Sequence, residues 1–188
     1  ENLVKLKAME MIIKSGIDGF SMQKLAKECN ISVATLYIYY KNKEDLILKI
    51  GTEEGEKMIY ASLKGFSSNM PFNEGLKIQW ENRAKFTLKN KLSSKFYEII
   101  QYTTYGETIS LKIIPLFSPV MKEFVSNAIK NKQLKFVSIE SYWCVAFGPL
   151  YTLLNFANKG KSIGNKPFKF SKKTMYDTLD YVLRALKP

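Results

Sequence analysis

The chain has 188 residues, a length that suits one domain or one small and one larger unit, and 46% of them are hydrophobic. This composition is typical of a globular protein. No apolar run reaches the roughly 18 residues of a membrane span, so no membrane association is expected. The sequence contains no histidine, which excludes histidine-based acid–base catalysis and most zinc sites. It also lacks a glycine-rich phosphate loop and a paired-carboxylate motif, so we expect no enzyme, no metal site and no cofactor.

The formal net charge of +12 favours a polyanionic partner such as nucleic acid. Residues 1–50 hold 8 basic and 6 acidic residues, whereas residues 51–188 hold 21 and 11. Lysines outnumber arginines by 27 to 2, a bias that solvated helix faces explain equally well. The charge alone therefore does not identify a nucleic-acid partner.

The two cysteines, Cys29 and Cys144, lie far apart in the sequence. Neither a disulfide framework nor a cysteine-rich metal site is supported. We expect both to be free, reduced thiols of a cytoplasmic protein.

Four short helices are predicted in the first fifty residues. The first ends at Gly16, in the usual position of a C-terminal cap. Ser21, Ser32 and Asn42 are N-caps for the next three, and Asn30 can take the left-handed conformation of a tight turn. Two short helices joined by such a turn form a helix-turn-helix unit, whose second helix would read DNA. The apolar face of the first helix consists of Leu3, Val4, Ala8, Met11 and Ile12.

Four apolar residues, Leu25, Ala26, Ile31 and Leu36, are spaced to hold the two short helices together. Ala26 is small enough to let the helices approach closely. We expect Ile31 to be buried within the turn.

Longer helices are predicted after residue 50. The stretch from Gly106 through Pro115 to Pro119 is expected to be irregular, because two prolines this close cannot lie inside a helix. Strand-like alternation is weak and no internal repeat is visible. The predicted fold is all-α with about nine helices: a three-helix helix-turn-helix DNA-binding domain over residues 1–48, and a larger helical bundle for ligand binding and dimerisation over residues 49–188. The later helices are expected at 43–65, 73–91, 93–105, 119–131, 137–158 and 172–186.

The segment from Phe20 to Leu46 resembles the DNA-binding segment of the tetracycline-repressor (TetR) family of bacterial transcription regulators. Its most characteristic parts are Thr35-Leu36-Tyr37 and the run Tyr39-Tyr40-Lys41-Asn42-Lys43-Glu44-Asp45-Leu46. The resemblance covers residues 4–50, about a quarter of the chain. The rest fits the family in length, helix count and all-α character.

The resemblance implies two sets of DNA-binding residues. The phosphate contacts would be Ser21, Thr35, Tyr37, Tyr39 and Lys43. The residues facing base edges would be Gln23, Val33 and Ala34, since Gln can pair with adenine and small apolar groups can touch a thymine methyl.

Two positions depart from the family pattern, and some candidates have simpler interpretations. Cys29-Asn30 replaces the usual small residue and glycine at the turn, and apolar Ile38 stands where a longer reading residue is common. Taken alone, Tyr37 and Tyr39 are more typical of packing aromatics, and Ser21 of a helix cap. Their joint placement in the helix-turn-helix frame favours DNA contacts.

By the same resemblance, the aromatic-rich remainder holds an effector pocket between helices. Core packing explains most of these aromatics. Glu98, Glu107 and Glu140 could face a cationic ligand, although each is more typical of a surface charge. The candidate ligand-binding residues are Trp80, Phe96, Tyr102, Phe117, Tyr142 and Phe147.

The last two predicted helices carry apolar faces, and in the family such helices pair with their copies in a homodimer. The implied function is a repressor that binds a palindromic operator in double-stranded DNA and is released by a small-molecule effector. The alternatives are a DNA-binding regulator that responds to a protein partner or to nothing, and a carrier or sequestering bundle with weak DNA binding. The apolar faces consist of Leu150, Leu153, Leu154 and Ala157, and of Met175, Leu179, Val182, Leu183 and Leu186.

Overall fold

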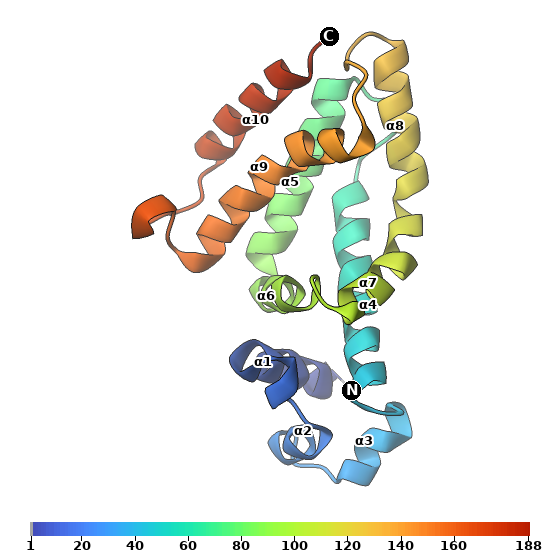
Figure 1. The fold of residues 1–188 in the computed structure, drawn as a ribbon, viewed down its shortest axis with the longest axis vertical. Helices are drawn as coiled ribbons and strands as arrows, with labels where there is room; N and C mark the ends of the chain where they lie inside the picture. The colour runs from blue at the N-terminus through green and yellow to red at the C-terminus, as the bar shows by residue number, and fades with distance from the viewer. Residues whose placement is uncertain (1) are drawn as a thin grey trace. The chain divides into compact units, whose positions relative to one another are not determined.

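The computed structural model describes residues 2–188, and in this range it contains ten α-helices, two short 3-10 helices and no β-strand (Figure 1). The all-α prediction is confirmed, with ten helices instead of about nine. Among residues 2–188, none of the helices combines the length and the apolar character that a membrane span requires. The helices are α1 (Asn2–Gly19), α2 (Met22–Glu28), α3 (Val33–Tyr39), α4 (Lys43–Leu63), α5 (Phe72–Lys89), α6 (Lys91–Ile100), α7 (Thr104–Ile113), η1 (Ile114–Leu116), α8 (Ser118–Lys130), α9 (Ile139–Lys159), η2 (Ile163–Asn165) and α10 (Lys172–Leu186).

The additional helix is α7, where an irregular stretch was expected, so that prediction was wrong. Pro115 lies in η1, after α7 has ended. Pro119 lies in the first turn of α8, where a missing N–H costs no helical hydrogen bond. The two prolines therefore lie where α7 ends and α8 begins, and they interrupt neither helix.

Helix α9 contains Pro149 in its interior, and the predicted helix at this position is confirmed nonetheless. A proline has no N–H to offer to the carbonyl four residues earlier. Next to that carbonyl, the indole Nε1–H of Trp80 donates to the carbonyl oxygen of Ala146 at 2.7 Å. Helix α5 thus supplies a donor to α9 beside the proline.

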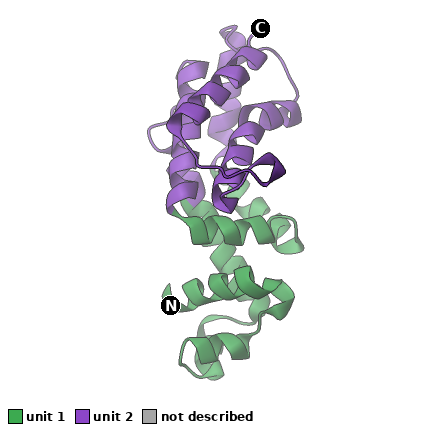
Figure 2. Ribbon diagram, turned by 90° about the vertical axis from the view of Figure 1, so that its left-hand side faces the viewer, with its two compact units in different colours: residues 1–57, 90–116 green, residues 58–89, 117–188 purple. Residues whose placement is uncertain are grey.

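The chain divides into two compact units (Figure 2). Unit 1 contains the described residues up to Lys57 together with residues 90–116, and unit 2 contains residues 58–89 and 117–188. Helix α4 belongs to both, since its first part lies in unit 1 and its end in unit 2. The predicted functional boundary at residue 48 remains a prediction, because the units follow packing and α6 packs against α1.

Unit 1 is built around α1, which packs against α2 and α6. The chain leaves helical geometry at Gly16, which has φ +71°, as the sequence predicted. The buried face of α1 differs slightly from the expected one, because Leu3 is exposed and Met9 is buried. In α4, Gly51 lies against the side chain of Ile109, and Gly55 against that of Ile113. Because neither glycine has a side chain, the isoleucine side chains of α7 can approach the backbone of α4 closely.

Unit 2 has one large apolar core, in which α9 packs against both α5 and α10. The apolar faces expected at a dimer interface mostly line this core. Leu153, Ala157 and Leu183 are only partly buried. These faces are buried within the protomer because they are the main apolar surfaces from which its core is built. The buried members are Leu150, Leu154, Met175, Leu179, Val182 and Leu186.

Candidate DNA-binding site

A tight turn joins α2 to α3. Asn30 has φ +58°, the left-handed conformation that the sequence predicted for it. The N–H of Cys29 donates to the carbonyl of Leu25 at 2.9 Å, and the N–H of Ile31 donates to that of Ala26 at 3.0 Å. These bonds satisfy two of the last four carbonyls of α2 and fix the direction in which the chain enters α3.

Leu25, Ala26 and Leu36 are buried and hold the two helices together, as expected. Ile31 is 36% exposed, so its predicted burial in the turn was wrong. The turn lies at the edge of the helix pair, and the other three residues already occupy the space between the helices. Ile31 therefore only borders this small core.

Serine side chains cap both short helices. The Oγ atom of Ser21 accepts the N–H of Lys24 at 3.3 Å, and that of Ser32 accepts the N–H of Thr35 at 3.0 Å. The hydroxyls of Ser32 and Thr35 also lie 2.8 Å apart, so one donates to the other. The Thr35 side chain is thereby held in one orientation at the start of α3.

The outer surface of α3 carries most of the predicted contact residues. Tyr37, Tyr39 and Ala34 are exposed, and Val33 and Thr35 are half-buried. Gln23, in the first turn of α2, is exposed as well. Gln23 and the α3 residues are thus exposed or half-buried on the two helices of the helix-turn-helix unit.

Ile38 is an additional candidate that the sequence interpretation left out of its contact set. It is 75% exposed, although it is a large apolar residue. It lies four residues after Ala34, so the two share one face of α3. The signal in the sequence was an isoleucine at a helix position next to polar, solvent-facing ones.

Asn42 caps α4, as predicted, by accepting the N–H of Asp45 at 2.8 Å. The Asp45 carboxylate accepts the backbone N–H of Lys41 at 3.0 Å and pairs with the Lys49 ammonium, also at 3.0 Å. The Lys41 N–H first, and then the Lys49 ammonium, hold the pKa of the Asp45 carboxyl below its usual value. An ionised carboxylate therefore stabilises the turn between α3 and α4.

Lys43 was predicted as a phosphate contact, and its ammonium donates to the carbonyl of Ile17 at 2.6 Å. An ammonium has three donors, so two remain for other acceptors. Lys43 is only half-buried. The bond to α1 fixes the position of the charge next to the start of α4.

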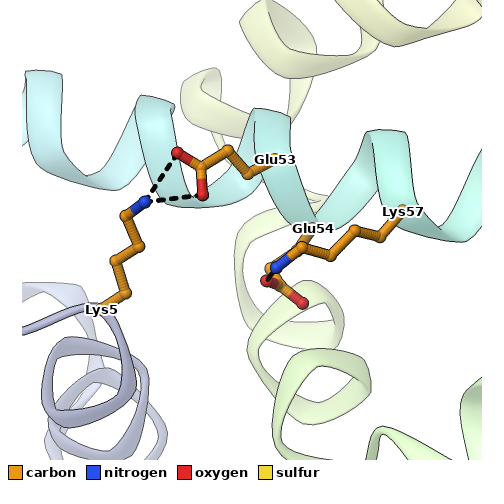
Figure 3. A network of polar contacts seen from close by, with 4 residues as sticks. All are labelled: Lys5, Glu53, Glu54 and Lys57. Atoms are coloured by element: carbon orange, nitrogen blue, oxygen red, sulfur yellow. Dashed lines mark hydrogen bonds and ion pairs between the residues drawn. The ribbon is translucent and has the colours of Figure 1, made fainter. Parts of the chain in front are cut away.

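A further ion pair joins α1 to α4. Figure 3 shows the Lys5 ammonium donating to both carboxylate oxygens of Glu53, at 2.9 and 2.8 Å. One turn along α4, Lys57 pairs with Glu54 at 2.6 Å. The second pair is mostly exposed on its lysine side and adds little stability.

The structure separates the predicted ligand-binding residues. Trp80, Tyr142 and Phe147 are buried in unit 2, and Phe117 packs partly against the same core. Phe96 is buried in unit 1. Tyr102 is 88% exposed at the turn between α6 and α7. Only the first four lie together.

Residues 7–50 match a family model described as bacterial regulatory proteins, tetR family. An uncharacterized HTH-type transcriptional regulator of Haemophilus influenzae is 31% identical over 80 residues, which is 43% of each chain. Another, from Bacillus subtilis, is 30% identical over 86 residues, 44% of this chain and 30% of its own length. The matches thus span less than half the length of these curated relatives.

The fold as a whole is similar to that of a solved TetR family transcription regulator from Marinobacter aquaeolei VT8. The likeness covers 99% of this chain and 94% of that chain, with a TM-score of 0.83 and 21% sequence identity. At this identity the likeness shows a shared fold. Residues 7–50 are thus similar to the bacterial regulatory proteins of the tetR family, and the chain shares the fold of this solved regulator.

Proposed function

We propose that the chain is a sequence-specific transcriptional repressor that binds a palindromic operator as a homodimer and is released from it by a small-molecule effector. The observation that carries the proposal is the surface of α3. Its inner side is fixed by buried Leu36, while Tyr37, Ile38 and Tyr39 face outward. Exposed side chains on a firmly packed short helix suit insertion into the major groove.

In this proposal the contact residues divide into two roles. Hydroxyl and ammonium groups would bind phosphate oxygens and set the register, and they carry no sequence information. Base edges would be contacted by Gln23 and by the apolar face of Val33, Ala34 and Ile38, which favours adenine and thymine in the half-site. The proposed phosphate contacts are Ser21, Thr35, Tyr37, Tyr39 and Lys43.

Dimerisation follows from the size of the reading surface. Helix α3 has only seven residues, so one copy can contact no more than a half-site. Two copies related by a twofold axis double the contact and match a palindrome. The dimer would use α9 and α10 through their outward faces, because their main apolar faces are buried in unit 2. Tyr181 and Val145 are exposed there.

The effector would act through unit 2. Trp80, Phe117, Tyr142 and Phe147 are the proposed ligand-binding residues that lie together. Helix α4 runs from the helix-turn-helix unit into unit 2 and is the proposed connection between ligand and DNA affinity. A ligand can shift DNA affinity only by binding one of the two conformations more tightly than the other.

A reporter strain tests the repressor proposal. A DNA site that the protein selects in vitro is placed over a promoter, and reporter output is measured with and without the protein. We expect the protein to lower the output and a Thr35→Val/Tyr37→Phe/Tyr39→Phe variant to lower it much less. A higher reporter output with the protein than without it would contradict repression. Equal output with the native protein and the variant would support a carrier or sequestering role.

A further inference from the structure

Arg83 of α5 is the only charged residue among residues 2–188 that is buried, with 5% of its surface exposed. The other buried polar residues are serines and one glutamine. A guanidinium stays charged in proteins, so unit 2 carries a positive charge in its interior.

The partners of Arg83 are a phenol and two aromatic rings. One Nη atom donates to the hydroxyl of Tyr151 at 2.7 Å. The guanidinium carbon lies 4.7 Å from the ring centroid of Phe147 and 5.7 Å from that of Trp143. No carboxylate of the described residues forms an ion pair with Arg83, and its Nε atom is buried without an acceptor.

Other polar atoms on α5 and α9 are also buried without partners. They are the hydroxyl of Tyr142, the Oε1 atom of Gln79 and the Oδ1 atom of Asn155. Gln79 precedes Arg83 by one turn of α5, and α5 packs against α9. Burial raises the pKa of Tyr142 well above its usual value, and the charge of Arg83 offsets this only in part. Tyr142 is therefore a neutral phenol that can donate a hydrogen bond.

A charge buried without a carboxylate partner is costly, and so are buried polar atoms that form no hydrogen bond. Packing alone does not call for this arrangement, because an apolar residue would fill the same space without the penalty. The Arg83 Nε–H and the Tyr142 hydroxyl are two donors that a carboxylate could accept from. The ring of Trp143 is 36% exposed, so the cluster reaches the surface of unit 2.

We propose that Arg83 binds the carboxylate of a small organic acid with an apolar body, with the Tyr142 hydroxyl as a second donor and the rings of Trp143 and Phe147 around the acid. This inference rests on the proposed function, whose unnamed effector it assigns to a chemical class. A planar guanidinium pairs well with a planar carboxylate, and one buried positive charge matches a monoanion. A cationic ligand is disfavoured, because Glu98, Glu107 and Glu140 are all exposed.

Binding of defined acids to the full chain tests the proposal. The probes are benzoate, phenylacetate, octanoate and decanoate, each beside its neutral amide, with dissociation constants measured by titration calorimetry. We expect at least one acid to bind with a Kd below about 1 mM and its amide to bind much more weakly. Binding should also change the tryptophan fluorescence of the native protein, since Trp143 is one of its two tryptophans. If no acid binds, or if acid and amide bind equally, the proposal is wrong.

The chain offers a matched control, because its only other arginine, Arg184, is exposed and pairs with Asp180 on the surface. We expect Arg83→Met to weaken binding of the acid at least about tenfold, and Arg184→Met to leave it unchanged. Should Arg83→Met fail to fold, Arg83→Lys keeps the charge but loses the planar fork, and it should still weaken binding. Equal affinity in the Arg83 variants and the native protein would overturn the proposal.

DNA affinity, measured separately, distinguishes this inference from the proposed function. Arg83-dependent acid binding without any effect on DNA would uphold the site and refute effector release. Operator binding that no acid changes, in a protein that binds no acid, would refute the site and leave the DNA-binding proposal intact.

Discussion

The hydroxyl of Ser32 accepts the backbone N–H of Thr35 at 3.0 Å, while the two side-chain hydroxyls lie 2.8 Å apart. One serine thus caps α3 and orients the Thr35 hydroxyl. Capping fixes the first turn of the helix, and the second contact fixes a group proposed to bind phosphate. Folding and the proposed DNA contact would therefore share the same few atoms at the start of α3.

Thr35→Val tests the phosphate role of this hydroxyl, because valine keeps the shape and removes the oxygen. We expect DNA affinity to fall by about 1 kcal/mol for each half-site, with similar losses on specific and non-specific duplexes. The salt dependence should stay the same, since no charge is removed. Fluorescence anisotropy with labelled duplexes measures both. Thr178→Val is the control, since that hydroxyl donates to the Thr174 carbonyl within α10. A loss restricted to one DNA sequence would contradict the phosphate role.

Lys43→Gln tests whether the ammonium binds phosphate in addition to the Ile17 carbonyl. We expect the slope of log K against log salt to become shallower by about 0.9 for each lost contact. Titrations at several salt concentrations give the slope. Lys173→Gln, which removes an exposed lysine of α10 paired with Asp177, should leave the slope unchanged. An unchanged slope in Lys43→Gln, with reduced stability, would restrict Lys43 to a structural role.

Asp45→Asn should remove part of the acid sensitivity of folding. The folded-state pKa of Asp45 is lowered, so its stabilising contribution is present above the unfolded pKa of about 3.9 and is lost as the pH falls through the folded value. Asparagine can still accept the Lys41 N–H but cannot titrate. Thermal unfolding between pH 6 and pH 3 should therefore show a smaller fall in Tm for the variant. Parallel curves for the two proteins would contradict this role of the carboxylate.

Gly51→Ala should destabilise unit 1, because the added methyl group would overlap the side chain of Ile109. Overpacking of this kind costs about 1–3 kcal/mol. Urea denaturation measures the change in the free energy of unfolding. Shortening the neighbour should relieve the overlap, so Gly51→Ala/Ile109→Ala is expected to lose less stability than the sum of the two single variants. Strict additivity would show that the two residues do not compete for the same space.

The helix-turn-helix unit could be predicted from the sequence because its signals are local. The Ser21 and Ser32 caps, the left-handed Asn30 and the glycine at position 16 all lie where the pattern placed them. Ile31 was misjudged, because burial depends on how much space its neighbours leave.

The body of the protein was harder to predict, since its decisive features depend on contacts between distant segments. Helix α7 was missed because Pro115 and Pro119 suggested one irregular stretch, whereas Pro115 follows the end of α7 and Pro119 lies in the first turn of α8. The aromatic residues predicted a ligand pocket in the larger part of the chain. Aromatic content alone does not distinguish a buried residue such as Trp80 from an exposed one such as Tyr102. Arg83 was not predicted as a site residue, because it is one of 29 basic residues in the sequence. Its signal was an arginine at the spacing of buried Leu76 and Trp80, in a chain whose basic residues are nearly all lysine.

Selection of binding sites from a random duplex DNA pool at near-physiological salt tests the central claim most directly. Salt is essential, because non-specific binding by a protein of net charge +12 would otherwise dominate. We predict enrichment of a palindrome with adenine and thymine in its half-sites, and weaker binding to that palindrome by the Thr35→Val/Tyr37→Phe/Tyr39→Phe variant. Salt-sensitive binding without an enriched sequence, in protein freed of bound small molecules, would contradict the claim that this chain is a sequence-specific regulator.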